Sequence, residues 1–285
     1  MKNCDLHTHS YYSDGSYSPV ELIDEALKLG LSAIALTDHN TTSGLDEFLS
    51  AANGKPIIAI PGIEFSTDYA HDNTVTELHM LALFIPPESY GEINARVSTM
   101  MQRKRLCNEE LVKALQKAGY CIDYEAICAI HMGTPNRANI AEALMNAGYV
   151  SSIKEAFSSL LSVNGPYYKA PARLDVFETV SFIKSVGAVA VLAHPFLNLS
   201  VPELREFLKK AVPAGLDAME TIYSTYDKET ILMAKKIAQE FNILESGGSD
   251  FHGTRKPHIA LGSGEGSLDV PSQVFEILKL KRRQL

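Results

Sequence analysis

The chain has 285 residues and a mass of 31.2 kDa, which is long enough for one large domain with a full hydrophobic core. Hydrophobic residues make up 46% of the sequence and charged residues 21%, a composition that excludes a disordered or fibrous chain. The 26 Lys and Arg residues against 34 Asp and Glu residues give a net charge of -8, which argues against a broad surface for nucleic-acid backbones.

The first part of the chain alternates apolar strand candidates with amphipathic helix candidates. Ser18 and Pro19, followed by Glu21, are typical of a helix start, and the helix that they open ends near Gly30. Continuous apolar runs such as the one at 32–37 are typical of strands buried on both faces of a parallel sheet. The predicted strands here are Cys4–His7, Ser32–Thr37, Pro56–Glu64 and Thr76–Phe84, with a second helix over about Ser43–Ala52.

The segment from about Ser89 to Lys169 breaks this alternation, because it contains helical patterns and no convincing strand. We expect residues 89–169 to form a helical insertion in a domain made of residues 1–88 and 170–285. Such an insertion could serve as a cap that selects the substrate, or it could serve packing alone. Its predicted helices are Glu92–Ala118, Tyr124–Ile130, Asn136–Ala147 and Ile153–Leu160.

After the insertion, the strand–helix alternation returns, with predicted strands Val186–Ala193, Ala218–Tyr223 and Ile243–Gly247. Repeated strand–helix units predict an α/β fold, either barrel-like or doubly wound. No apolar run approaches the roughly 18 residues that a membrane helix requires, and the N-terminus has no apolar signal core. The four cysteines form no CxxC pair, so we expect reduced thiols in a cytoplasmic protein.

Six of the nine histidines lie in short polar clusters, most of them at the end of an apolar strand candidate. Side chains two residues apart share a face of an extended segment, so His7 and His9 can converge on one ion. One such histidine is more often a structural residue than a ligand, but a barrel brings all these clusters to one rim. Without metals, so many buried imidazoles and carboxylates would be left unpaired at high cost. The sequence therefore predicts a multinuclear metal site.

The motifs that carry these clusters are HxH followed by SDG, then TDH, GIEF, ELHML, AHP and GSDFHG, in this order from His7 to His252. Together they resemble the PHP (polymerase and histidinol phosphatase) superfamily. The helical insertion is similar to that of the stand-alone branch that includes nucleotide phosphatases, rather than to a DNA-polymerase domain. The resemblance implies a distorted (β/α)7 TIM-like barrel with three divalent ions at its rim.

The resemblance also implies which residues hold each ion. His7, His9, Glu64 and Asp250 would hold the first. Glu64 would bridge to a second ion, which His79 and His194 complete, and the third would be held by Asp14, His39 and His252. Mixed imidazole and carboxylate ligands suit manganese, zinc or iron, and the sequence does not choose among them.

Two further groups of residues are candidates for roles in the reaction. His194 and Asp38 are the catalytic candidates; Asp38 could orient His39 or handle protons, or it could simply cap a turn. Glu220 lies at the same predicted rim, and we expect it to support the site rather than bind an ion. The substrate-binding candidates, each of which could instead be a surface charge, are Arg137, which resembles a phosphate-binding arginine at a helix start, with Lys169, Arg255 and Lys256.

The expected activity is hydrolysis of a small phosphate monoester, with a nucleotide of the AMP or 3',5'-bisphosphate type as the expected substrate. In this hypothesis a hydroxide that bridges two ions attacks phosphorus, and the ions offset the developing charge. The expected partner is a small phosphorylated substrate, with no long nucleic acid and no membrane, and the oligomeric state is not predicted. Histidinol phosphatase, a 5'-3' exonuclease acting on short oligonucleotides, and a non-catalytic metal-binding module stay open as alternatives.

Overall fold

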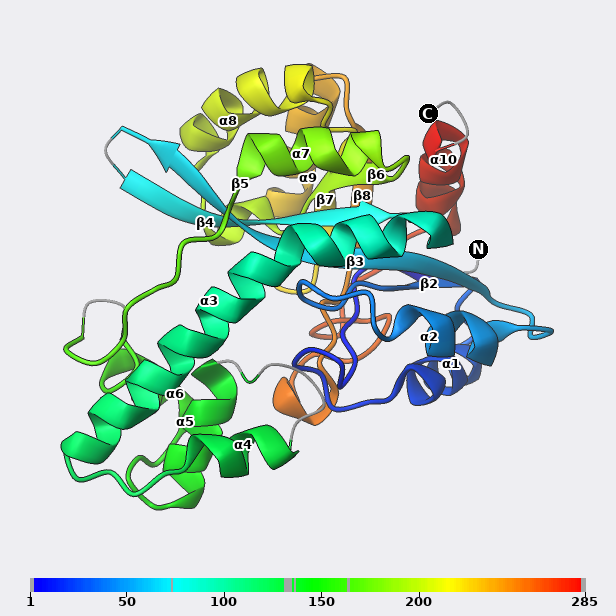
Figure 1. Cartoon of the computed structure of the whole chain (residues 1–285). Coiled ribbons are helices and arrows are strands. Elements are labelled where there is room, and N and C mark those ends of the chain that lie inside the picture. The colour runs from blue at the N-terminus through cyan, green and yellow to red at the C-terminus, as the bar shows by residue number, and fades with distance from the viewer. Residues whose placement is uncertain (1–2, 73, 131–134, 136, 163–164, 283–285) are drawn as a thin grey trace. The chain divides into compact units, whose positions relative to one another are not determined.

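The computed structural model describes residues 3–72, 74–130, 135, 137–162 and 165–282 (Figure 1). The chain divides into two compact units, one formed by residues 1–94 and 174–285 and the other by residues 95–173. The first unit contains all of the described strands and the second is helical.

The first unit is built on one sheet of eight strands, in the order β1-β2-β3-β4-β6-β7-β8, with β5 paired to β3. Backbone hydrogen bonds also join the two ends of this order: the Leu6 amide donates to the Gly247 carbonyl (3.2 Å), and the Asp250 amide donates to the His7 carbonyl (2.8 Å). The sheet therefore closes on itself, and the predicted distorted barrel is confirmed. Its strands are β1 (Cys4–Asp5), β2 (Ala33–Leu36), β3 (Ile58–His71), β4 (Thr74–Leu83), β5 (Leu174–Asp175), β6 (Val189–Leu192), β7 (Ala218–Tyr223) and β8 (Leu244–Gly248).

Apolar runs form these strands because both faces of the sheet are covered. Every residue of β2, β6 and β7 is buried, which agrees with the near-continuous hydrophobic sequences of parallel strands. Side chains such as Leu6, Leu81 and Val191 fill the interior of the barrel as one core cluster. Because apolar side chains fill the interior, the polar side chains of a functional site are expected at the ends of the strands.

Strand β4 departs from the parallel arrangement that the sequence suggested for the barrel. It runs antiparallel to both of its neighbours, β3 and β6, and Ser66 of β3 lies opposite His79 of β4. The hairpin is longer than predicted, since β3 continues beyond Glu64 to His71. His79 therefore lies within its strand, near the middle, whereas the other histidines follow the ends of theirs.

Helices join the strands of the first unit, and their boundaries follow local capping signals. Ser18 and Glu21 form the predicted capping box at the start of α1, and Asp175 caps α7 by accepting from two backbone amides. None of the described helices has both the length and the apolar character needed to cross a membrane. The helices of this unit are α1 (Pro19–Lys28), α2 (Leu45–Ala52), α7 (Val176–Ser185), α8 (Val201–Ala214), α9 (Lys228–Glu240) and α10 (Ser272–Arg282), with short 3-10 turns at Pro87–Ser89, Pro195–Leu197 and Gly253–Arg255.

The second unit has a hydrophobic core of its own. Leu111, Leu115, Ile140 and Leu144 are almost completely buried within it. Residue 136, where the sequence predicts a helix to begin, lies outside the described residues, and the described helix begins at Arg137. The helices of this part of the chain are α3 (Tyr90–Lys117), α4 (Tyr124–Ile130), α5 (Arg137–Asn146) and α6 (Ile153–Ser158).

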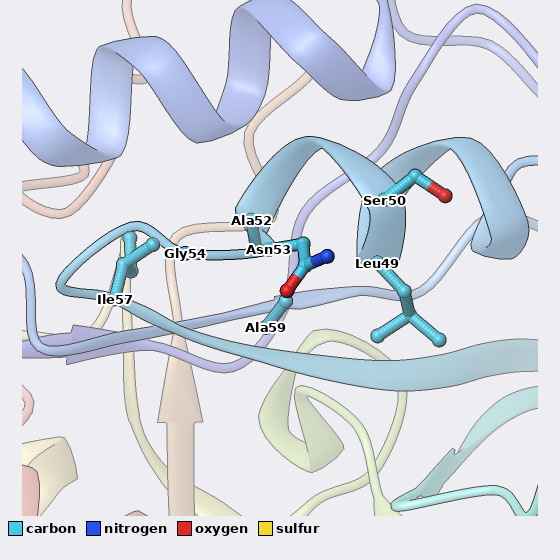
Figure 2. Close-up of a pocket in the computed structure, with 7 residues that line it drawn as sticks. All are labelled: Leu49, Ser50, Ala52, Asn53, Gly54, Ile57 and Ala59. Atoms are coloured by element: carbon cyan, nitrogen blue, oxygen red, sulfur yellow. The ribbon is translucent and has the colours of Figure 1, made fainter.

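A surface depression of about 490 Å³ lies between α2 and the beginning of β3 (Figure 2). It contains no titratable side chain, so it offers none of the acid–base or metal-binding groups that the sequence singled out. Its lining residues are Leu49, Ser50, Ala52, Asn53, Gly54, Ile57 and Ala59.

Candidate metal centre

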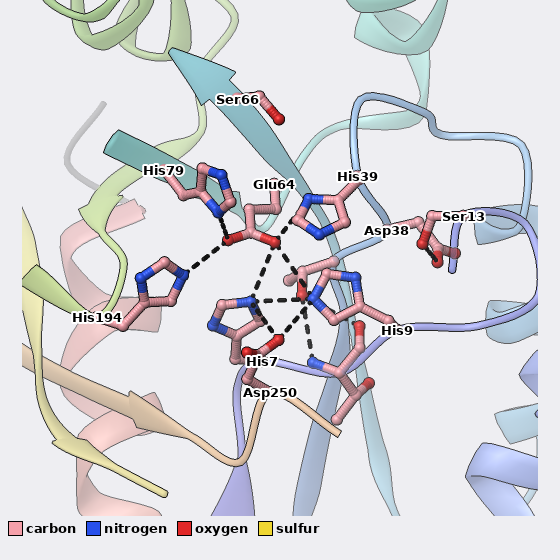
Figure 3. Close-up of polar contacts among 12 residues, drawn as sticks. His7, His9, Ser13, Asp38, His39, Glu64, Ser66, His79, His194 and Asp250 are labelled. Carbon is pink, nitrogen blue, oxygen red and sulfur yellow. Dashed lines mark hydrogen bonds and ion pairs between the residues drawn. The ribbon is translucent and has the colours of Figure 1, made fainter. Parts of the chain in front are cut away.

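The six histidines from the sequence clusters converge at one end of the barrel, and all of them except His252 are labelled in Figure 3. They come from segments far apart in the chain: His7 and His9 follow β1, His39 follows β2, His79 belongs to β4, His194 follows β6 and His252 follows β8. Glu64 of β3 and Asp250, just after β8, lie among them. The structure thus brings together the residues that the sequence assigned to one site.

The carboxylate of Glu64 lies at the centre of the cluster and is fully buried. Its Oε1 atom lies 2.7 Å from Nδ1 of His79 and 3.1 Å from Nε2 of His194. Its Oε2 atom lies 3.0 Å from Nδ1 of His39 and 3.2 Å from Nε2 of His9. Each oxygen therefore faces a different set of ring nitrogens, which is the arrangement that a bridging carboxylate requires.

The side chains of His7 and His9 share a face, as the spacing of two residues predicts. Their Nε2 atoms lie 3.1 Å apart, and the Nε2 of His9 lies 3.1 Å from Oδ1 of Asp250. Both rings are fully buried. Two ring nitrogens that face each other at this distance, beside a carboxylate, are well placed to share one cation.

A second group gathers around Asp14, whose carboxylate is held on the loop after β1. Its Oδ1 lies 3.2 Å from Nε2 of His252 and 3.9 Å from Nδ1 of His9, and its Oδ2 lies 3.8 Å from Nε2 of His39. The ring centroids of His9 and His252 are only 4.2 Å apart. His9 is thus close to both groups, whereas the resemblance placed it with the first ion alone.

Three sets of donor atoms in the described part of the chain lie within 4.8 Å of one another. They are His9, Asp14, His39 and His252; His7, His9 and Glu64; and His39, Glu64 and His79. Three buried atoms of these sets, His9 Nδ1, His39 Nδ1 and Glu64 Oε2, make no hydrogen bond, although His39 Nδ1 and Glu64 Oε2 lie 3.0 Å apart. Buried polar atoms are rarely left without a partner in native proteins, so donors of the types that bind transition metals fit divalent ions here.

The electrostatics of the cluster agree with a site for cations. Burial by itself lowers the pKa of His79 and of His9, but hydrogen bonds and charges from Glu64 outweigh this effect and help to raise the two pKa values to about 10 and about 9. Conversely, the imidazoles hold the pKa of Asp14, Glu64 and Asp250 well below the usual range in spite of burial. The carboxylates are therefore charged, and positive charge accumulates between them.

Asp38, a catalytic candidate, has a different set of contacts from the ones that the sequence suggested. Its Oδ1 accepts hydrogen bonds from the backbone amide of Ser10 (2.8 Å) and from the hydroxyl of Ser13 (2.5 Å), and its Oδ2 accepts from the hydroxyl of Ser10 (2.6 Å). No contact joins it to the ring of His39 in the described structure. Its carboxylate instead anchors the loop that carries Asp14.

Two of the four substrate-binding candidates follow β8 in the barrel unit. The ammonium group of Lys256 lies 2.8 Å from Oδ2 of Asp250, so this cation stands beside the cluster. The hydroxyl of Tyr223 donates to the same oxygen (2.8 Å), which leaves Oδ1 of Asp250 for the histidines. Arg255, one residue earlier, ends a 3-10 turn and is partly buried.

The other two candidates belong to the helical unit. Arg137 is the first residue of α5, and its guanidinium lies over the rings of Tyr168 (4.2 Å) and Phe157 (5.2 Å) and donates to the carbonyl of Leu161. These contacts explain how the arginine is held within its own unit. The side chain of Lys169 is exposed.

Several features of the site left little trace in the sequence. The backbone of His194 and of Asp250 adopts positive φ angles of 28° and 56°, which are strained for residues other than glycine. Such strain is common at functional sites but has no signature in residue type. Glu220 is a fully buried carboxylate that contacts His7 and the backbone of His194, and its only sequence signal is a charge inside an apolar strand.

The sequence profile of the PHP domain matches residues 5–172, which is more than half of the chain. This chain belongs to the PHP family. The matched part of this PHP protein runs from β1 to the end of the helical insertion.

Individual relatives agree with this assignment. A 5'-3' exoribonuclease from Haemophilus influenzae is 30% identical to the PHP protein over 256 residues, which are 88% of this chain and 90% of the relative. A 3',5'-nucleoside bisphosphate phosphatase from Chromobacterium violaceum is 26% identical over 273 residues, with coverage of 95% and 91%. Among solved structures, a candidate metal-dependent phosphoesterase from Bifidobacterium adolescentis matches with a TM-score of 0.84 at 27% identity and covers 99% of this chain and 96% of that chain.

These findings confirm the resemblance to the PHP superfamily that the motifs indicated. The chain is a metal-dependent phosphoesterase of this family, with a cluster of His, Asp and Glu residues suited to divalent ions. The relatives differ in their named activities, one being a 5'-3' exoribonuclease and the other a 3',5'-nucleoside bisphosphate phosphatase.

Proposed function

We propose that this PHP protein hydrolyses a phosphate monoester of a small nucleotide, of the AMP or 3',5'-bisphosphate type. The observation that carries the proposal is the position of Glu64, whose two carboxylate oxygens lie within 2.7–3.2 Å of ring nitrogens of four different histidines. The Chromobacterium violaceum relative, named as a 3',5'-nucleoside bisphosphate phosphatase, supports the choice of a nucleotide.

In this proposal three divalent ions, manganese, zinc or iron, occupy the cluster. His7, His9, Glu64 and Asp250 hold one, Glu64 with His79 and His194 a second, and Asp14 with His39 and His252 the third. Three such ions and three carboxylates leave a formal charge of about +3 before more distant groups are counted. A pocket of this charge attracts anions, and a phosphate monoester is the natural occupant.

When bound, the ions supply Lewis-acid chemistry: they lower the pKa of water and offset the negative charge that develops during phosphoryl transfer. The residues of the chain fix the arrangement in which this occurs. His79 of β4 and His194, just after the neighbouring strand β6, both approach Oε1 of Glu64, while Asp38 immobilises the loop that carries Asp14. No covalent intermediate on the protein is required by this scheme.

Substrate selection is proposed for the cationic residues. Lys256 is the most direct candidate, because its ammonium group is already 2.8 Å from Asp250. Arg255 would assist from the same turn. In the helical unit, Arg137 and Lys169 would select the substrate if residues 89–169 act as a cap, while an insertion that serves packing alone would leave them without this role.

A second candidate function is 5'-directed cleavage of short oligonucleotides. The Haemophilus influenzae relative, a 5'-3' exoribonuclease at 30% identity, is the observation in its favour. The net charge of -8 makes tight binding of long polymers unfavourable, but it permits short ones. Both reactions use the same metal centre, so only the choice of substrate distinguishes them.

The test combines metal analysis of the purified protein with activity on a panel of substrates. The panel contains a nucleoside monophosphate, a 3',5'-bisphosphate, a 5'-phosphorylated trinucleotide and histidinol phosphate. We expect bound divalent metal and the fastest phosphate release from a mononucleotide. Preference for the trinucleotide would replace the proposal by the exonuclease function, and preference for histidinol phosphate by that activity.

The His194→Ala variant tests whether the cluster performs the reaction. We expect turnover to fall by at least about 100-fold with the fold retained. The matched control is His71→Ala, since His71 lies at the end of β3, where it contacts Thr76 and stacks on Tyr69 away from the cluster. Equal turnover in the two variants would refute the proposed centre, and metal binding without turnover on any substrate would favour a non-catalytic module.

A further inference from the structure

We propose that Glu220 is a positioning residue that fixes two imidazoles of the metal centre with a single carboxylate; this inference rests on the proposed centre. Its Oε1 atom lies 3.0 Å from Nδ1 of His7, and its Oε2 atom accepts a hydrogen bond of 2.7 Å from the backbone amide of His194. The side chain is fully buried. One residue of β7 thereby links the segment after β1 to the segment after β6.

The contact with His7 requires Glu220 to reach past β8, which lies between β7 and β1 in the closed sheet. Strand β8 ends in Gly247 and Gly248, and Gly248 carries no side chain on the side that faces His7. A Cβ atom built at Gly248 would collide with Cβ of His7. Gly248 therefore permits the close approach of β8 to the histidine that Glu220 holds, whereas a Cβ atom at Gly247 would meet Ile222 and Val270 instead.

For His7, the carboxylate determines which ring nitrogen faces the centre. A carboxylate is an acceptor, so Nδ1 of His7 must carry the hydrogen that it donates to Glu220. The nitrogen left for an ion is then Nε2, which lies 3.3 Å from Oε2 of Glu64 and 3.1 Å from Nε2 of His9. Partners of this kind fix both the orientation and the basicity of an imidazole ligand.

For His194, the same carboxylate stabilises an unfavourable backbone conformation. The φ angle of 28° lies outside the regions that residues with a side chain prefer, and strain of this kind persists only where surrounding contacts enforce it. The hydrogen bond from the His194 amide to Glu220 is such a contact. It holds the residue where Nε2 lies 3.1 Å from Oε1 of Glu64 and where the ring stacks beside His7, with centroids 5.7 Å apart.

Glu220 acts through these two residues and not as a ligand. The three groups of donor atoms that lie within 4.8 Å of one another do not by themselves decide this, since they also leave out His194 and Asp250. The Oε1 atom of Glu220 faces the ring nitrogen of His7 that points away from those groups, and its Oε2 atom is engaged by a backbone amide. The geometry therefore assigns it to orientation of the histidines.

The test is the affinity of the Glu220→Gln variant for Co²⁺, measured by competition with a chelator and by the visible absorption of the bound ion. Glutamine has one acceptor oxygen and a donor amide, so it cannot accept from both His7 and His194. We expect Co²⁺ affinity to fall about 10- to 100-fold and the absorption to change. At saturating metal, kcat should fall while the KM for a phosphate monoester stays within about twofold of wild type.

The matched control is Asp217→Asn. Asp217 precedes β7, is also a buried carboxylate, and likewise accepts from a backbone amide of β6, that of Ala190, but it pairs with Lys184 away from the cluster. We expect it to lose thermal stability with unchanged Co²⁺ affinity and absorption. An equal loss of affinity in both variants would show that Glu220 supports only the fold and would overturn the proposal.

Two further outcomes are decisive. Wild-type affinity and absorption in Glu220→Gln would overturn the positioning role, whereas failure of the wild-type protein to bind Co²⁺ would refute the metal centre itself. If Glu220→Gln does not fold, Glu220→Asp is measured in its place, because it keeps the charge but is one methylene too short to reach both partners. Weakened Co²⁺ binding in a folded Glu220→Asp protein supports the proposal, and unchanged binding contradicts it.

Discussion

The substitution Gly248→Ala adds a single methyl group at the point where β8 meets the segment after β1. The new Cβ atom would collide with Cβ of His7, and it would lie 2.5 Å from the His7 amide nitrogen and 2.9 Å from its Cα. Two of these neighbours are backbone atoms, which cannot rotate away, so the strands must separate. Overpacking of this kind costs about 1–3 kcal/mol, and a contact with backbone belongs at the upper end.

The expected result has a thermodynamic and a functional part. A loss of about 3 kcal/mol corresponds to a fall in Tm of roughly 5 °C for a chain of this size. Displacement of His7 also disturbs the ligand cluster, and a misplacement of about 1 Å can reduce the rate of an enzyme about 100-fold. Thermal unfolding, monitored by circular dichroism, and phosphate release at saturating Mn²⁺ measure the two effects.

Gly91→Ala is the matched control for this substitution. Gly91 is an exposed residue in α3, and a Cβ atom built there meets nothing within 4 Å. Alanine is favoured over glycine inside a helix by about 0.5–1 kcal/mol, so this variant should be slightly more stable and fully active. If Gly248→Ala has the stability and activity of the control, then β8 does not hold His7 by close contact, and the reasoning is refuted.

Three further predictions concern the metal centre. Removal of metal with a chelator should lower the free energy of unfolding by about 2.7 kcal/mol relative to protein at a metal concentration 100 times Kd, and an unchanged melting curve would contradict metal binding by the folded state. Asp38→Ala removes the acceptor for Ser10 and Ser13. Because this loosens the loop that carries Asp14, the variant should bind fewer ions per chain, and an unchanged ion count in elemental analysis would contradict the prediction. Lys256→Ala should raise the KM for a phosphate monoester several-fold with a smaller change in kcat, whereas steady-state kinetics with an unaltered KM would leave Lys256 as an ion-pair partner of Asp250 only.

Local sequence was sufficient to predict most elements because their signals lie within a few residues. Ser18 and Glu21 mark the start of α1 through contacts inside one helical turn. The apolar runs of β2 and β6 agree with their complete burial. The end of β3 was misplaced because the hairpin with β4 depends on pairing between strands, and Ser66 gives no local sign that it faces His79.

The types of the ligand residues could also be predicted, because a sheet that closes into a barrel brings the motifs at the ends of its strands to one rim. The spacing of His7 and His9 alone places two imidazoles on one face of an extended segment. The membership of His9 in one group with Asp14 and His39, however, depends on the loop that Asp38 anchors. That anchor joins residues that are 28 positions apart, and no periodicity encodes it.

By itself, the sequence determined which residue types stand at the ends of the strands, and therefore that this chain offers nitrogen and oxygen donors to divalent ions. Only the tertiary structure decided the direction of β4, the strained backbone of His194 and the reach of Glu220 past Gly248 to His7. The physical reason is the range of the interactions. Capping and burial patterns act over a few residues, whereas closure of the barrel joins side chains more than 200 positions apart, such as His7 and Glu220 at a separation of 213.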